Sequence, residues 1–267
     1  MTHKVLVLGI DGVRYDALQQ VRTPHLDAIA AAGFIRPIRV DDAAPTISGP
    51  GWATVATGVL APKHQIYGND LAGNALHTYP DFLTRLSQLG FGTYAAAAWQ
   101  PLLSSDSGGP VFLGGGFQPA MDSHDGPSWR QADRQIAEHA AKALGSGDVS
   151  AAFVYLGAPD EVAHQSGTGP EYLETVEGAD IMVGTVLDAL KGDWVVIAVT
   201  DHGHIDGGGH GGDSEFERTA WVAACGPTIP TTAPESLGHK DIHPHLLTSL
   251  GVDLDPAWGL DGKPFDS

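Results

Sequence analysis

Acidic and imidazole side chains gather directly after three apolar runs of this 267-residue chain. They are Asp11, in GIDG; Asp160 and His164, in PDEVAH; and Asp201 and His202, in TDHGH. If the runs are parallel strands, these side chains should converge, because ligands bind at the carboxyl ends of such strands. Carboxylate and imidazole ligands without thiolates suit zinc, with manganese as the alternative.

The spacing of these residues predicts two metal positions. Asp160 and His164 lie one helical turn apart, so a helix would present both to one ion. Asp201 and His202 are adjacent in a loop and can both reach a second ion. Two ions about 4 Å apart can hold the attacking and leaving oxygens of an in-line displacement at phosphorus. The chemistry indicated is therefore phosphoryl transfer.

A hydroxyl nucleophile is available in the segment APTISGPGWATVATG. Ser48 lies just before a short helix-like stretch that runs to Thr57, so its hydroxyl would sit at a helix amino terminus, where backbone N–H groups favour a developing anion. Capping of that helix is the other explanation for Ser48 or Thr46. Metal coordination of the hydroxyl would activate it for attack. Thr46 lies two residues earlier, and the sequence pattern alone does not separate the two.

The segments that must position these residues alternate between strands and helices. Strands are expected at 4–10, 91–98, 152–156, 194–200 and 219–225. Helices are expected at 23–32, 79–89, 128–144, 170–190 and 241–250. This alternation predicts a three-layer α/β sandwich with helices on both faces of a mostly parallel sheet. We expect a single domain over 1–267, with a loop or small insertion at about 100–127.

Composition narrows the possible partners. The net charge of -18 argues against binding to nucleic acid polymers, although bound metals can reverse the local field. No apolar run approaches the roughly 20 residues of a membrane helix, so no membrane partner is expected. Asp11 and Arg14 interrupt the first apolar run, which favours a strand over a signal peptide. The single Cys225 excludes an internal disulfide and suits the cytoplasm.

Several motifs, taken in order, resemble the alkaline phosphatase superfamily, and within it the nucleotide pyrophosphatase/phosphodiesterase branch. They are VLGIDGVR, TPHLDAIAAAG, APTISGPGWATVATG, DEVAHQSG, TDHGH, GGHGGD and DIHPHLLTSLGV. The resemblance covers nearly the whole chain. It implies an alkaline phosphatase-like fold, two divalent metal ions, expected to be zinc, and a small-molecule phosphate ester as substrate.

The resemblance also implies roles for individual residues. One metal would be held by Asp11, Ser48, Asp201 and His202, and the other by Asp160, His164 and His210. His204, in the same loop as His210, is the alternative ligand. The resemblance selects Ser48 over Thr46 as nucleophile. Asn69 matches an asparagine that binds a non-bridging phosphoryl oxygen, where it would act with the Ser48 backbone N–H. Turn chemistry beside Asp70 is the other explanation for Asn69.

The expected activity is hydrolysis of phosphodiesters or nucleotide pyrophosphates through a phosphoseryl intermediate. Gly49 stands where the branch often has an aromatic residue, which leaves Trp52, Tyr67 or Trp99 for base stacking. Sulfatase activity is not expected, because Gly51 and Trp52 replace the small residue and arginine of that motif.

Four alternatives remain open. A phosphomonoesterase would need extra cationic groups, for which Arg14 and Lys63 are the candidates. A phosphonate hydrolase and a metal-dependent phosphomutase would share the metal core. A non-catalytic binding protein would have no need for Ser48.

Overall fold

The three apolar runs that precede the acidic motifs form neighbouring parallel strands in the computed structural model, which describes residues 3–266. They are β1 (Lys4–Ile10), β4 (Ala151–Leu156) and β5 (Trp194–Val199). β1 lies between β4 and β5 and pairs with both in parallel. Every residue of β4 and β5 is buried, which explains their continuous apolar sequence.

Three further strands complete a six-stranded sheet in the order β2-β6-β5-β1-β4-β3. They are β2 (Gly33–Arg39), β3 (Thr93–Ala96) and β6 (Thr219–Cys225). β6 is antiparallel to both of its neighbours, and the remaining pairs are parallel. The predicted mostly parallel sheet is thus confirmed. β2 was not predicted; it is an edge strand that carries Pro37, a residue tolerated in sheets mainly at edges.

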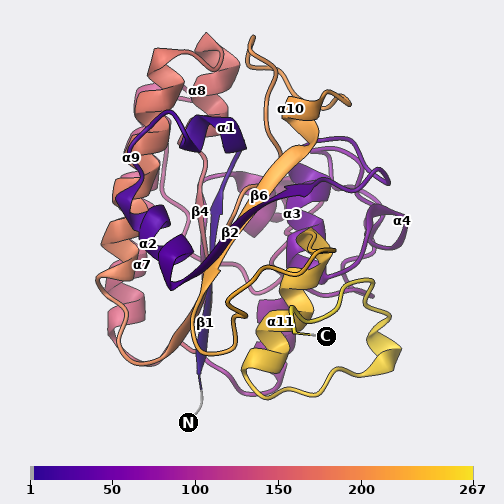
Figure 1. Cartoon of the computed structure of the whole chain (residues 1–267). Coiled ribbons are helices and arrows are strands. Elements are labelled where there is room, and N and C mark those ends of the chain that lie inside the picture. The colour runs from indigo at the N-terminus through magenta and orange to yellow at the C-terminus, as the bar shows by residue number, and fades with distance from the viewer. Residues whose placement is uncertain (1–2, 267) are drawn as a thin grey trace.

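Helices cover both faces of the sheet (Figure 1). One layer contains α2 (Pro24–Ala32), α7 (Gly126–Gly145) and α9 (Pro170–Leu187), together with the shorter α1 (Tyr15–Leu18) and α8 (Ala158–Ser166). The other layer contains α3 (Ser48–Thr57), α5 (Phe82–Gln88) and α11 (Ile242–Ser249). α7 packs on α9 and β4, whereas α11 packs on α3, α5 and β1. The arrangement confirms the predicted three-layer α/β fold.

Element boundaries differ from the predictions where a cap decides them. The helix expected at 79–89 begins at Phe82, because the Asp81 side chain accepts from the Thr84 N–H at 2.9 Å and caps it. The segment expected as a loop, 100–127, contains α6 (Gln100–Leu103) and a 3-10 turn at Ser105–Ser107. The remaining short helices lie in connecting segments. They are α4 (Ala61–His64), α10 (Glu215–Arg218), η2 (His239–Asp241) and η3 (Pro256–Trp258).

Among the described residues, no helix combines the length and the apolar character required to traverse a bilayer.

Candidate metal centre and nucleophile

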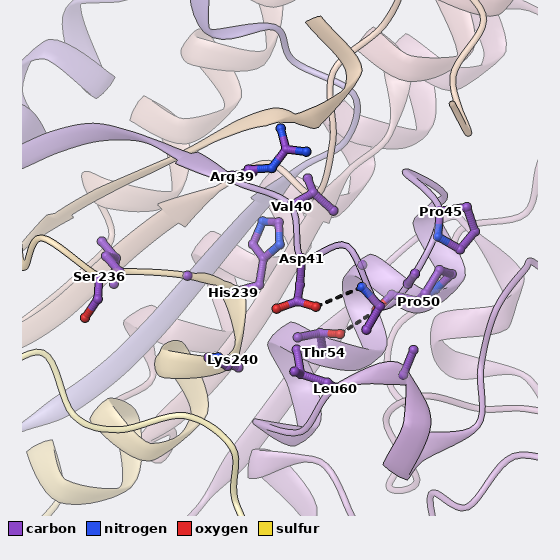
Figure 2. Close-up of a pocket in the computed structure, with 16 residues that line it drawn as sticks. Arg39, Val40, Asp41, Pro45, Pro50, Thr54, Leu60, Ser236, His239 and Lys240 are labelled. Carbon is purple, nitrogen blue, oxygen red and sulfur yellow. Dashed lines mark hydrogen bonds between the residues drawn. The ribbon is translucent and has the colours of Figure 1, made fainter. Parts of the chain in front are cut away.

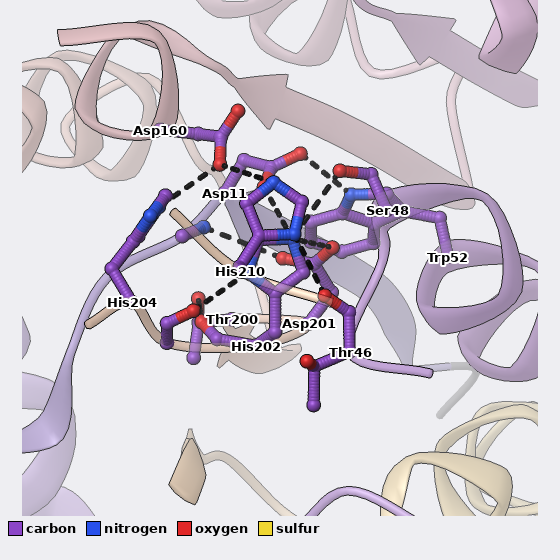
Figure 3. A network of polar contacts seen from close by, with 12 residues as sticks. Asp11, Thr46, Ser48, Trp52, Asp160, Thr200, Asp201, His202, His204 and His210 are labelled. Atoms are coloured by element: carbon purple, nitrogen blue, oxygen red, sulfur yellow. Dashed lines mark hydrogen bonds and ion pairs between the residues drawn. The ribbon is translucent and has the colours of Figure 1, made fainter. Parts of the chain in front are cut away.

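The predicted ligands converge at the carboxyl ends of β1, β4 and β5 (Figure 3). Three sets of side chains each bring their ligand atoms within 4.8 Å of one another. The sets are Asp11, Asp201 and His202; Asp160, His164 and His210; and Asp160, His202 and His204. The first two sets match the metal positions that the sequence resemblance implied. The third adds His204 to a cluster in which His210 is also present.

Asp11 follows β1, and its two carboxylate oxygens differ in their hydrogen bonding. Its Oδ2 accepts hydrogen bonds from Trp52 Nε1 at 2.9 Å and from the Tyr155 hydroxyl at 2.7 Å. Its Oδ1 is buried and has no hydrogen-bond partner among the described residues. Two aromatic donors therefore fix the carboxylate and leave one oxygen directed into the cluster.

Asp201 and Asp160 repeat this arrangement. The Asp201 Oδ1 accepts from the Gly12 N–H at 3.4 Å, while its Oδ2 is buried without a hydrogen bond. The Asp160 Oδ2 lies 3.3 Å from His164 Nε2, and its Oδ1 has no hydrogen bond within the described chain. Unsatisfied buried carboxylate oxygens are costly, and a cation between them would supply the missing partner. The donor set therefore fits divalent metal ions.

Three histidines of the cluster are oriented by backbone carbonyls. The Nδ1 atoms of His202, His204 and His210 lie 3.1 Å from Gly203 O, 3.0 Å from Gly208 O and 2.7 Å from Thr46 O, in that order. A carbonyl only accepts, so each Nδ1 carries the proton and each Nε2 offers a lone pair. A hydrogen bond from the ring nitrogen that does not face the metal is typical of metal-binding histidines and fixes the orientation of the ring. His210 Nε2 also lies 3.0 Å from His164 Nε2.

The electrostatics of the centre also favour a bound cation. Burial raises the pKa of the Asp11 carboxyl to about 7, and the charge of Asp160 adds to the increase. Burial and the charges of Asp11 and Asp160 raise the pKa of Asp201 well above its usual range. Burial, with the nearby His210, lowers the pKa of His202, which keeps this ring neutral. A divalent cation would favour the ionised carboxylates and bind the neutral imidazole.

Ser48 is the first residue of α3 and is almost buried. Its Oγ lies 3.3 Å from His202 Nε2, so the hydroxyl reaches the first ligand set. Gly51, one turn further along α3, allows this approach. A Cβ atom at Gly51 would lie 2.9 Å from the Asp201 Cβ. The helix therefore presents its amino terminus to the predicted metal position.

Thr46 has a different role. Its hydroxyl donates to Gly212 O and accepts from the Gly211 N–H, both at 2.9 Å. Its carbonyl accepts from His210 Nδ1 at 2.7 Å. Thr46 thus connects the nucleophile segment to the loop that carries His210, and its hydroxyl is engaged in that connection.

Asn69 lies beside the amino terminus of α3 and is exposed. Its Oδ1 accepts from the Gly49 N–H at 2.9 Å, which fixes the orientation of the amide. The NH₂ group of the amide is not used in this contact. A Cβ atom at Gly49 would lie 2.1 Å from Gly68 O. The chain therefore has no room here for the aromatic residue that the branch often carries.

One candidate role from the sequence, base stacking by Trp52, is wrong, and the two candidate cations are held in ion pairs. Trp52 has no exposed surface and cannot stack a base. Arg14 is paired with Asp16 and Asp206 at 2.7 and 2.6 Å. Lys63 is paired with Asp261 at 2.6 Å. These ion pairs explain why neither cation is available to a phosphomonoester.

Sequence reasoning missed the residues that hold the ligands in place. Besides Trp52 and Tyr155, Asp133 on α7 accepts from the backbone N–H groups of Gly157 and Ala158, each at 2.9 Å. This contact fixes the start of α8, the helix that carries Asp160. The available signal was Tyr155, the one residue with a polar side chain in the buried strand β4, because a buried tyrosine hydroxyl needs a partner.

A cavity of about 160 Å³ lies beside α3 but contains none of the predicted ligands (Figure 2). Its walls come from α3 and from the segments 39–45 and 236–240. His239, in this wall, is buried and donates from Nε2 to Thr200 O at 2.8 Å. His239 therefore supports the strand end before Asp201 rather than the metal centre itself.

Comparison with known families decides the assignment of the whole chain. Residues 5–141 and 93–213 match the family model for type I phosphodiesterase / nucleotide pyrophosphatase. The chain belongs to this family. The predicted resemblance to the nucleotide pyrophosphatase/phosphodiesterase branch is thereby confirmed.

The chain is also similar to curated proteins and to solved structures. The human GPI ethanolamine phosphate transferase 3 catalytic subunit is 27% identical over 128 residues, which are 46% of this chain and 12% of that protein. This chain thus corresponds to a small part of that relative.

Human ectonucleotide pyrophosphatase / phosphodiesterase 5 has a TM-score of 0.69 at 17% identity and covers 95% of this chain and 96% of its own. The 2-O GAG sulfatase BT1596 has a TM-score of 0.75 at 14% identity, covering 100% and 76%. At these identities the structures establish the fold.

Proposed function

We propose that this family member hydrolyses phosphodiesters or nucleotide pyrophosphates through a phosphoseryl intermediate on Ser48. One observation carries the proposal: the Ser48 Oγ, at the start of α3, lies 3.3 Å from His202 Nε2 and beside the converging carboxylates. A hydroxyl with this placement can attack phosphorus. A murine ectonucleotide pyrophosphatase / phosphodiesterase 5, in an inactive form complexed with AMP, has the same fold and supports a nucleotide-type substrate.

Two divalent ions, zinc in our proposal, would be held by the residues that the resemblance implied. Asp11, Ser48, Asp201 and His202 would hold one, and Asp160, His164 and His210 the other. Such ions supply stabilisation of negative charge on the oxygens around phosphorus. The unpartnered oxygens of Asp11, Asp160 and Asp201 support this assignment. We also propose that residues 1–267 act as one domain, because one sheet positions every ligand.

The remaining steps belong to side chains of the protein. The Ser48 Oγ forms a bond to phosphorus as the bond to the leaving oxygen breaks. Water then attacks the phosphoserine, which releases the product monoester and restores the hydroxyl. The Asn69 NH₂ group and the Ser48 backbone N–H would donate to a non-bridging phosphoryl oxygen as charge develops. The Gly49 contact that fixes Asn69 supports this role.

Diesters are preferred over monoesters in this proposal because Arg14 and Lys63 are engaged in ion pairs. A monoester carries additional negative charge that needs additional cations. The similarity to GPI ethanolamine phosphate transferase 3 supports a second possibility, in which an alcohol rather than water attacks the phosphoserine. The two possibilities share Ser48 and differ in the acceptor.

Turnover of bis(p-nitrophenyl) phosphate and of p-nitrophenyl phosphate by the zinc-reconstituted protein tests the proposal. We expect a higher kcat/KM for the diester, and loss of activity on both substrates in Ser48→Ala. A higher kcat/KM for the monoester would make the protein a phosphomonoesterase. If neither substrate is hydrolysed but added alcohols accept the phosphoryl group, the transferase possibility would replace hydrolysis.

A further inference from the structure

The His204 imidazole is oriented as a metal ligand usually is, with one ring nitrogen on a backbone carbonyl and the other in the cluster. The ligands expected for the two metal positions do not include it. We propose that His204 binds a divalent cation through Nε2, together with Asp160 and His202, at an inner position that is an alternative to the position of Asp11, Asp201 and His202. This inference rests on the proposed function, because it requires that the centre bind metal. It adds one ligand and one coordination position to that centre.

The orientation of the imidazole is the first observation. His204 has no exposed surface, and its Nδ1–H donates to Gly208 O at 3.0 Å. His202 and His210, the two expected ligands of this loop, are held by backbone carbonyls in the same way. The His204 Nε2 is therefore a buried lone pair that lies without a hydrogen bond among the described residues.

The surroundings of this lone pair are the second observation. The His204 Nε2 lies 3.0 Å from the Asp160 Oδ1, which is also buried and without a hydrogen bond in the described part of the chain (Figure 3). Two acceptors in this position repel each other unless a proton or a metal cation lies between them, and the tautomer set by Gly208 O places no proton there. The ligand atoms of His202, His204 and Asp160 all lie within 4.8 Å of one another, as in the other two sets.

Gly12 provides the third observation. It has a φ of +66°, and a Cβ atom there would lie 2.5 Å from the His204 Nε2 and 2.8 Å from the Asp160 Oδ1. Any larger residue would fill the space in which these two atoms meet. The glycine therefore preserves room at the inner position, and its backbone N–H separately reaches Asp201.

The inner set shares its other members with the two expected positions. Asp160 also belongs to the set with His164 and His210, and His202 to the set with Asp11 and Asp201. A cation at the inner position would thus contact one ligand from each. Because the His202 Nε2 has a single lone pair, the first ion would occupy either the inner position or the position with Asp11 and Asp201, and not both at once. We expect His204 to strengthen retention of the first metal equivalent, since it offers that ion a further nitrogen ligand in the buried part of the centre.

Metal binding by purified full-length variants tests this inference. Zn²⁺ affinity would be measured by competition with a chromogenic chelator, and Co²⁺ coordination by its visible absorption spectrum. His204→Phe removes both nitrogens, whereas His204→Gln keeps a polar side chain that can donate to Asp160. His243→Phe is the matched control. His243 is buried and donates from Nδ1 to Ala56 O at 2.6 Å, but its ring packs edge-on to Phe82.

We expect both His204 variants to bind the first Zn²⁺ equivalent at least about 10-fold more weakly than the wild type, with a changed Co²⁺ spectrum. The control should bind as the wild type does. The metal-free His204→Gln protein should melt somewhat below the wild type, because the Nδ1–H bond to Gly208 O is lost, but it should remain folded at the temperature of the binding measurements.

Three results would overturn the inference. Wild-type affinity in both His204 variants would show that the imidazole is not a ligand. Wild-type affinity in His204→Gln alone would show that His204 only orients Asp160 by hydrogen bonding. An equal loss in His243→Phe would show a general effect of lost packing. A wild type that binds no metal would overturn the proposed function as well. This result is distinguishable from the other three, in which the wild type binds metal.

Discussion

The indole Nε1 of Trp52 donates a hydrogen bond of 2.9 Å to the Oδ2 of Asp11, which joins the nucleophile helix α3 to the end of β1. The Tyr155 hydroxyl donates to the same oxygen at 2.7 Å. Together they leave the Asp11 Oδ1 as the atom that faces the cluster. Partners of this kind set the orientation and basicity of a metal ligand.

Removal of the indole donor should weaken metal binding without unfolding the protein. Trp52→Phe keeps an aromatic ring in the core and removes the N–H group. We expect a fall in Zn²⁺ affinity of about 10- to 100-fold, measured by chelator competition. Trp194→Phe is the control, because Trp194 donates to Lys191 O at the opposite end of the sheet. Equal affinities in the two variants would contradict an orienting role for Trp52.

Gly49 should be essential for the position of the nucleophile helix. In Gly49→Ala the new methyl group would lie 2.1 Å from Gly68 O, so the segment that carries Asn69 must move. We expect a loss of about 1–3 kcal/mol in the free energy of unfolding, measured by urea denaturation, and a lower kcat. Gly68→Ala is the matched control, since a Cβ atom at Gly68 meets nothing within 4 Å. Similar losses in both variants would argue against the steric explanation.

Asn69 should act on the transition state through its NH₂ group. Asn69→Asp keeps an oxygen for the Gly49 N–H and removes the donor, so the fold should be retained. We expect kcat on a chromogenic diester to fall at least about 100-fold while the melting temperature changes little. A kcat close to that of the wild type would assign Asn69 to turn structure alone.

Four buried histidines outside the metal cluster should make the protein sensitive to acid. Burial lowers the pKa of His64, His239 and His245 to about 4 and that of His243 to about 3. Their folded pKa values lie below the ordinary 6.5, so their stabilising contribution is present above pH 6.5 and is lost as the pH falls toward 4.

Urea denaturation from pH 8 to pH 4 checks this expectation. The contribution of these histidines to the free energy of unfolding should be nearly constant above pH 7 and should fall below pH 6.5. The raised pKa values of Asp11 and Asp201 act in the opposite direction, so the share of His243 is taken from the difference between the wild type and His243→Phe. In His243→Phe the slope between pH 6 and pH 4 should be shallower by up to about 1.4 kcal/mol per pH unit, the share of one proton. An unchanged slope would mean that His243 titrates normally in the folded protein.

Much of the fold and of the cluster could be predicted from the sequence because the signals were local. Unbroken apolar runs such as Lys4–Ile10 require burial on both faces, and the polar residues after them were bound to meet at one edge of the sheet. The helix spacing of Asp160 and His164 was also local, and α8 places both in the cluster.

The missed features depend on contacts between distant segments. β2 lies at the sheet edge and has only two buried residues, Phe34 and Ile38, so its pairing with β6 cannot be inferred from GFIRPIR. The contacts of Trp52 and Tyr155 with Asp11 span 41 and 144 residues of sequence. Arg14 pairs with Asp206 and Lys63 pairs with Asp261, and both partners lie far away in the sequence. The sequence alone therefore does not indicate that the two cations are already paired.

A phosphorylated Ser48 would be the most direct evidence for the proposed chemistry. The zinc-reconstituted protein would be mixed with a phosphodiester, quenched in acid within milliseconds, digested and examined by mass spectrometry. We expect one adduct that retains the non-leaving ester group, located on Ser48 and missing from Ser48→Ala. Turnover without any adduct, or an adduct on Thr46 instead, would contradict the assignment of Ser48 as the nucleophile.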